Sequence, residues 1–258
     1  MAGSDPDHLI VRQTPIDPEI LLRQHAARKV TIDGRACSER DLAALAVLRH
    51  ATHVQLTGMR SALGALAALP RLEQLHLVDP HTLEGLSAMP RLTSLTIYCF
   101  PKIHSLAPIA SLVNLRSLLL STPPGYDASR KCHDVDSLQP LEHLRYLERL
   151  TLRGILPARG RLSPLSALTQ LRELAVTHVY AFGLEDYAGL ARALPATSGH
   201  CLRPYFAAHW TGRCRACGRP RVALTAPPPR TPRTLCPDCD RARLERHVAN
   251  WNDVMSRS

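Results

Sequence analysis

Apolar residues fall at almost every third position of residues 71–97, which read RLEQLHLVDPHTLEGLSAMPRLTSLTI. An amphipathic helix repeats its apolar residues near every 3.6 positions, and a half-buried strand repeats them at every second position. The spacing of three is broken by two-residue steps at Leu75–Leu77 and Leu95–Ile97. This pattern fits neither element for long, and it predicts short strands that alternate with tight turns of three residues per turn.

The step "apolar-x-apolar" recurs along the chain at intervals of 20 to 32 residues, as Val30/Ile32, Val54/Leu56, Leu75/Leu77, Leu95/Ile97, Leu118/Leu120, Leu150/Leu152 and Leu174/Val176. A repeat of about 20–29 residues with the pattern L-x-x-L-x-L is typical of leucine-rich repeats. Units such as LPRLEQLHL, MPRLTSLTI and LVNLRSLLL give the chain its resemblance to that family from about residue 29 to 178, with about seven repeats.

The resemblance implies an α/β fold, a solenoid in which each L-x-L segment adds a strand to a curved parallel sheet. Asp17-Pro18-Glu19 and Ser38-Glu39-Arg40-Asp41 are typical helix starts, so we expect helices that cap the N-terminal end. The stretch HCLRPYFAAHW is expected to close the last repeat. The polar residues 121–136 are expected to project as a loop.

Two C-x2-C pairs, Cys214/Cys217 and Cys236/Cys239, are separated by 18 residues. This spacing is typical of a zinc site, because one tight turn can aim both sulfurs of a pair at the metal. Four thiolates fill a tetrahedral shell and leave no open position, which predicts a structural rather than a hydrolytic Zn²⁺. Residues 211–240 resemble a zinc ribbon, and residues 241–254 are expected to form a terminal helix that packs on the ribbon or on the solenoid.

These features predict four segments. Residues 1–28 form an N-terminal arm and capping helix, and residues 29–178 form the leucine-rich repeats. Residues 179–210 form a C-terminal cap or linker, and residues 211–258 form the zinc-ribbon-like module with its terminal helix.

The formal net charge of +10 is concentrated at the C-terminus, where residues 201–258 hold 11 arginines against four acidic residues. No run approaches the 18 to 20 apolar residues of a membrane span, and the first residues lack the pattern of a secretory signal. We therefore expect a cytoplasmic protein without a membrane segment. No phosphate loop, nucleophile elbow or open metal site is present in the sequence, so we expect a non-enzymatic protein. We also expect a monomer.

The leading hypothesis is a recognition scaffold whose concave sheet face binds a protein partner. The residues expected to point outward for this purpose are His53, Gln55, Gln74, His76, Tyr98, Arg149, Thr151 and Arg153. The alternative hypothesis is binding of nucleic acid through the basic module, with phosphate contacts from Arg213, Arg215, Arg219, Arg221, Arg230 and Arg233. The loop between the two cysteine pairs lacks aromatic residues for base stacking, which weighs against this alternative.

Overall fold

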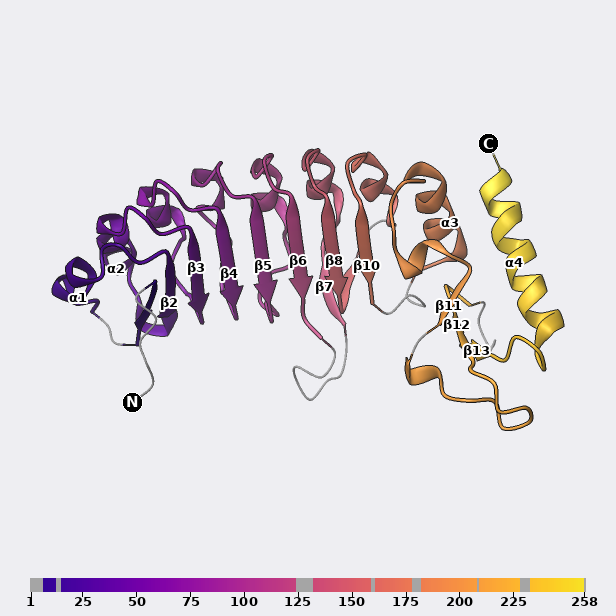
Figure 1. Ribbon diagram of the computed structural model, residues 1–258. Coiled ribbons are helices and arrows are strands. Elements are labelled where there is room, and N and C mark those ends of the chain that lie inside the picture. The colour runs from indigo at the N-terminus through magenta and orange to yellow at the C-terminus, as the bar shows by residue number, and fades with distance from the viewer. Residues whose placement is uncertain are drawn as a thin grey trace.

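The computed structural model describes residues 7–12, 15–123, 132–158, 161–177, 182–207, 209–227 and 233–257. This part of the chain forms a row of stacked turns with an eight-stranded parallel sheet along one side (Figure 1). The strands lie in chain order and are β1 (His8–Val11), β2 (Lys29–Asp33), β3 (His53–Thr57), β4 (Gln74–Val78), β5 (Ser94–Tyr98), β6 (Ser117–Ser121), β8 (Arg149–Arg153) and β10 (Glu173–Val176). None of the described helices is long and apolar enough to cross a bilayer.

The predicted apolar pairs lie in register across the whole sheet. Val30 pairs with Val54, Val54 with Leu75, and the same row continues to Leu174 on β10. The apolar residues of these pairs are at most 2% exposed, whereas the residues between them face solvent. Each strand therefore buries its two apolar side chains on one side of the sheet and presents the alternate side chains on the other.

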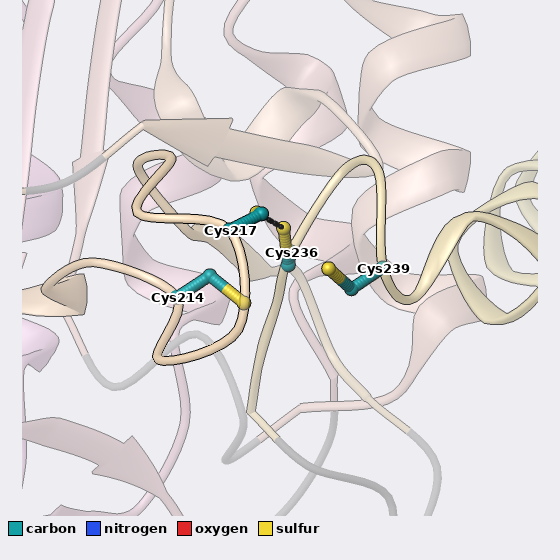
Figure 2. A group of neighbouring side chains, drawn as sticks. All are labelled: Cys214, Cys217, Cys236 and Cys239. Atoms are coloured by element: carbon teal, nitrogen blue, oxygen red, sulfur yellow. Dashed lines mark hydrogen bonds between the residues drawn. The ribbon is translucent and has the colours of Figure 1, made fainter.

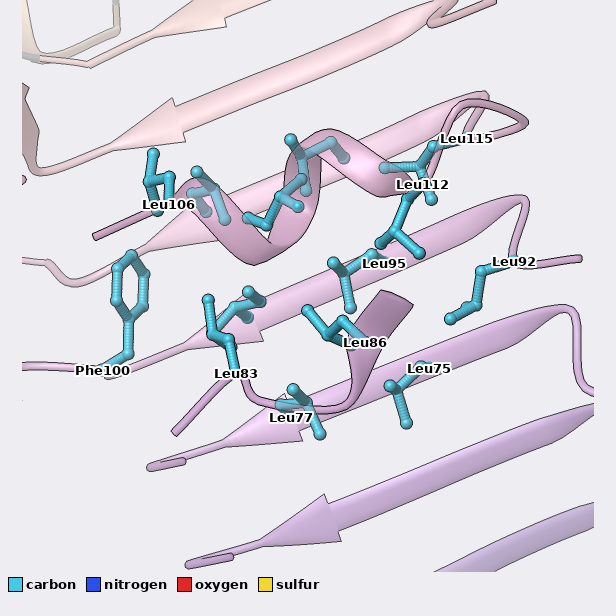
Figure 3. Close-up of a cluster of buried hydrophobic side chains, with 14 of the residues drawn as sticks. Leu75, Leu77, Leu83, Leu86, Leu92, Leu95, Phe100, Leu106, Leu112 and Leu115 are labelled. Carbon is cyan, nitrogen blue, oxygen red and sulfur yellow. The ribbon is translucent and has the colours of Figure 1, made fainter. Parts of the chain in front are cut away.

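Short 3-10 helices form most of the return arms, as the three-residue spacing predicted. They are η1 (Gly34–Ala36), η2 (Leu45–Val47), η3 (Gly64–Ala68), η4 (Leu86–Ala88), η5 (Ala107–Ser111), η6 (Gln139–His143) and η7 (Ser163–Ala167). Leu83 and Leu86 of one arm point into the layer that Leu75 and Leu77 occupy from the strand (Figure 3). Fully burying one such leucine contributes about 1.5–3 kcal/mol, and neighbouring turns share the core.

The N-terminal end carries one strand more than the repeat pattern predicted. Strand β1 pairs in parallel with β2, and helix α1 (Pro18–Arg23) follows it. Helix α2 (Glu39–Ala44) begins with the predicted capping box, in which the Ser38 hydroxyl accepts from the Asp41 N–H and the Asp41 carboxylate accepts from the Ser38 N–H. The Asp41 carboxylate also accepts a hydrogen bond from the Ile16 N–H at 2.8 Å, which holds the arm against the solenoid.

Part of the stretch expected to project as a loop is a strand. Residues 124–131 lie outside the described chain, but β7 (His133–Val135) pairs in parallel with β9 (Ile155–Pro157). His133 is buried, its Nε2 lies 2.7 Å from the Ile103 carbonyl, and its ring packs edge-on against Phe100. The segment is polar in sequence, but its alternate residues His133 and Val135 are buried against the preceding turn.

The C-terminal region consists of α3 (Leu184–Ala193), η8 (His200–Leu202), η9 (His209–Thr211), a small antiparallel sheet and the long helix α4 (Arg241–Ser256). The sheet contains β11 (Tyr205–Ala207), β12 (Val222–Leu224) and β13 (Thr234–Leu235). It takes β11 from the predicted cap and the other two strands from the predicted module, so it crosses residue 211. That boundary stays a prediction.

Helix α4 packs on both neighbours, which were the two alternatives for it. Leu244 belongs to a small cluster with Leu224 and Leu235 of the three-stranded sheet. Trp251 is 4% exposed and belongs to the core of the solenoid, where Val254 and Met255 also pack. Between these contacts, His247 Nε2 lies 2.8 Å from the Pro204 carbonyl. Figure 1 shows α4 beside α3 at the end of the row of turns.

Candidate functional site

The four cysteines of the two C-x2-C pairs lie together at the base of the small sheet (Figure 2). Their sulfur atoms are all within 4.8 Å of one another, and the sulfurs of Cys217 and Cys236 are 3.5 Å apart. All four are free thiols. A tetrahedral zinc shell with metal–sulfur distances of about 2.3 Å places its sulfurs roughly 3.8 Å apart. The cluster is therefore compatible with a metal site.

Short-range hydrogen bonds shape the turn that carries each pair. In the first turn, the Gly218 N–H donates to the Cys214 carbonyl at 2.9 Å, and Gly218 has a φ of 73°, which favours glycine. In the second turn, the Cys236 N–H donates to the Asp240 carboxylate at 2.9 Å. An ion pair of 2.8 Å between Arg219 and Asp238 joins the two turns. The sulfurs thus converge from two separately braced turns.

Backbone N–H groups of Cys217 and Ala216 lower the pKa of Cys214 to about 7. Contact with the sulfurs of Cys217 and Cys214 raises the pKa of Cys239 to about 12. One thiol therefore ionises readily while a neighbour is held neutral, because adjacent thiolates repel each other. A divalent cation at the centre is the species that would allow all four sulfurs to ionise.

The solvent face of the main sheet contains a hollow of about 300 Å³ over strands β1 to β5. Four residues of the predicted partner-binding set line it, namely His53, Gln55, Gln74 and His76. The remaining polar lining comes from His8, Lys29, Thr31, Ser94 and Thr96. Burial lowers the pKa of His76, which favours its neutral form. Among these lining residues, Lys29 is the only lysine, and there is no arginine, aspartate or glutamate. The hollow is therefore lined chiefly by hydrogen-bonding groups.

The other four residues of the predicted partner-binding set lie outside this hollow, further along the same face. Tyr98 is on β5 and is 37% exposed. Arg149, Thr151 and Arg153 are on β8, where the two arginines are exposed and Thr151 is half-buried. The outward residues of β3 to β5 therefore include no lysine, arginine or acidic residue, whereas β8 presents two exposed arginines.

The predicted phosphate-binding arginines have different environments. Arg213 donates to the Gly218 carbonyl at 2.9 Å, Arg221 donates to the Thr234 carbonyl at 2.6 Å, and Arg219 pairs with Asp238. Arg215 is exposed at the tip of the first turn. Arg233 interacts with another group of the protein, and Arg230 lies outside the described residues. Three of the six thus also brace the small sheet and its cysteine turns.

No protein-family model matches the chain, and no curated protein matches its sequence. Solved structures do resemble it. An internalin of Listeria monocytogenes has 16% identity over 71% of this chain and 63% of its own, with a TM-score of 0.45. The leucine-rich repeat domain of the type III effector XopL has 22% identity over 65% of this chain and 67% of its own, with a TM-score of 0.41. Toll, in the Toll–Spatzle complex of Drosophila, has 14% identity over 65% of this chain and 23% of its own, with a TM-score of 0.48.

The fold is a leucine-rich repeat solenoid. Its periodic strands and return arms carry this assignment, and the resemblances concern the fold alone, because all three identities are below 25%.

Lys29 and Thr31 on β2, His8 on β1 and the exposed Trp210 were not predicted from the sequence as functional candidates. His8 lines the hollow from β1, and the signal for that strand was present, because Leu9/Val11 is a further apolar-x-apolar pair that precedes Val30 by 21 residues. Trp210 was expected to help close the last repeat. Cys201 of the same stretch is indeed buried, but Trp210 is 67% exposed. The chain leaves the solenoid at β11, before it reaches Trp210. No local sequence pattern predicts this change of direction.

Proposed function

We propose that the chain is a non-catalytic scaffold that binds a protein partner on the solvent face of its parallel sheet. The hollow over β1 to β5 is the observation that carries this proposal. Strands in register hold its donors and acceptors in fixed rows, so the surface loses little conformational entropy when a partner binds. Its amide, hydroxyl and imidazole groups suit the polar groups of a peptide chain, and the exposed arginines of β8 suit acidic residues further along the partner.

Site-specific photocross-linking can test the face directly. We would place a photoreactive amino acid at Gln55 or Thr96 in the hollow, and at Val113 as a matched control on the return arm, where Val113 is 46% exposed. We expect one protein to be captured from Gln55 and Thr96 and not from Val113. Capture of the same protein from Val113 alone would contradict the proposed face.

The partner identified in this way can then be measured in purified form. Joint replacement of Gln55, Gln74 and His76 by alanine should weaken its binding at least tenfold, because several hydrogen bonds are lost together. Joint replacement of Tyr98, Arg149 and Arg153 tests the other half of the face. The melting temperature should change little in both variants, because all six side chains are on the solvent side of the sheet. Unchanged affinity in both variants would refute the proposal.

We further propose that Cys214, Cys217, Cys236 and Cys239 hold one structural zinc ion. The proximity of the four sulfurs, the free thiols and the two braced turns support this proposal. With four thiolate ligands the ion would have no open position for water or substrate, so its contribution would be to folding. Elemental analysis of protein purified without chelator should give one zinc per chain, and a metal-free, fully folded chain would refute the site.

A further inference from the structure

Trp210 is the most exposed large hydrophobic side chain of the described chain, at 67%. The second tryptophan, Trp251, is 4% exposed in the core. Exposing an indole costs free energy that burial would recover, and exposed aromatic side chains are common at binding surfaces. Trp210 is not part of the solenoid core, so packing does not explain why a tryptophan occupies this position.

The backbone beside Trp210 is firmly held. The Thr211 hydroxyl donates to the Arg221 carbonyl at 2.7 Å, and the Arg221 N–H donates to the Gly212 carbonyl at 3.1 Å. These bonds close the base of the hairpin that carries the first cysteine turn, and Trp210 directly precedes that base. In Figure 1 the connection between β11 and β12, which contains this hairpin, extends beyond the small sheet and away from the main one. The indole is thus presented from a fixed position.

The stretch of sequence that contains Trp210 is strongly basic. No aspartate or glutamate occurs between Asp186 and Asp238, whereas that stretch contains Arg192, Arg203, Arg213, Arg215, Arg219, Arg221, Arg230 and Arg233. Arg213 is exposed and donates one N–H to a backbone carbonyl, which leaves further N–H groups for a ligand. Arg221 is half-buried, and its Nε–H is enclosed in the protein. Arg219 forms an ion pair with Asp238.

An exposed indole among cations fits an anionic polymer with aromatic faces better than it fits a protein. A protein hot spot of this kind is normally surrounded by further apolar contacts. The neighbours that follow Trp210 are Thr211, Gly212 and Arg213. Unpaired bases stack on aromatic side chains while arginines meet the phosphates. We propose that Trp210 and the arginines of the 211–221 hairpin bind single-stranded nucleic acid, with one base stacked on the indole. This activity is separate from recognition of a protein by the main sheet.

Binding of a fluorescently labelled oligothymidine, roughly 12 nucleotides long to match one small binding module, tests the proposal by anisotropy. Trp210→Ala should weaken binding by roughly tenfold or more, the effect of losing one stacked base, and Trp210→Phe should retain most of the affinity. Tyr146→Ala is the matched control, since Tyr146 is 57% exposed on the solenoid, and it should leave the affinity within about twofold of the parent. Emission from buried Trp251 reports whether each variant remains folded.

Intrinsic fluorescence gives a second readout. The oligonucleotide should quench the emission of the parent protein and should leave Trp210→Ala unquenched, because Trp251 is buried. A duplex of equal length should bind more weakly, since its bases are already stacked. The proposal is overturned if Trp210→Ala binds like the parent, if the duplex binds as tightly as the single strand, or if no oligonucleotide binds at low salt.

Discussion

The solenoid and the C-terminal module reach a folded state by different means. In the solenoid, every turn from β2 to β10 contributes leucines to one continuous core, and several of these side chains are completely buried. The cluster of the small sheet contains three buried leucines, Leu224, Leu235 and Leu244. In the first case each turn is small, but many similar turns share one core. In the second, α4 docks on the solenoid and so adds apolar contacts to a small core. The zinc ion that we propose at the four cysteines would add the stability that a core of this size lacks.

Replacing a cysteine ligand should give the largest difference between the two regions. Cys236 is buried, and Cys236→Ser removes a thiolate from the proposed zinc site. Metal binding in small zinc peptides is worth on the order of 10–16 kcal/mol, so residues 211–240 should unfold. Amide exchange should become fast there and stay slow in β3 to β6. Cys132→Ser, outside the cluster, is the control and should change neither region. Full protection of residues 211–240 in Cys236→Ser would show that their stability does not depend on this cysteine, which would contradict the prediction.

Truncating Trp251 should break the contact between the regions without touching the cysteines. Trp251→Ala removes the largest α4 side chain from the solenoid core, and such truncations cost about 3–5 kcal/mol. We expect faster exchange in α4 and in α3, on which it packs, with normal exchange in β3 to β6. Zinc content should be retained, because Leu244 and the cysteine turns are unchanged. Equal protection of α4 in the variant and the parent would show that the helix is held by the small sheet alone.

The repeats could be predicted from the sequence because each leucine position is specified by the same local geometry in every turn. The cysteine cluster could also be predicted from the sequence, since two short spacings define it. The strand at His133–Val135 and the exposure of Trp210 were not predicted. The strand depends on contacts distant in sequence, such as His133 with Ile103, and the exposure of Trp210 depends on how the chain turns away from the solenoid after β11. The hollow was predicted in part, because strand register identified its outward residues on β3 and β4 but not the contributions of β1 and β2.

Two glycine variants test how closely neighbouring turns of the solenoid pack. Gly85 has a φ of 87°, and a Cβ there would lie 2.2 Å from the Gly64 backbone nitrogen. Gly85→Ala should therefore destabilise the solenoid by more than the roughly 1–2 kcal/mol of a left-handed conformation alone. Gly189 in α3 has open space around its Cα, so Gly189→Ala should instead stabilise by about 0.5–1 kcal/mol. Denaturant unfolding followed by circular dichroism would measure both, and a stable Gly85→Ala would contradict the tight approach of these turns.

The smallest expected effect is a dependence of solenoid stability on pH. Burial lowers the pKa of His133 below its usual value of 6.5, so the unfolded chain binds the proton more readily. This contribution to stability is complete above pH 6.5 and is lost as the pH falls from there through the lower folded-state pKa. His133→Gln should have a smaller loss of stability between pH 7 and pH 5 than the parent. Parallel pH profiles of the two proteins would assign the loss to other groups.

We expect the C-terminal module to need a bound metal in order to fold and the solenoid to fold without it. Hydrogen exchange of the parent protein, measured segment by segment with and without a zinc chelator, tests it most directly. We predict that the chelator removes one zinc per chain and abolishes amide protection in residues 211–240, while β3 to β6 keep theirs. Unchanged protection of residues 211–240 after the metal is removed, or loss of protection through the whole solenoid, would contradict the claim.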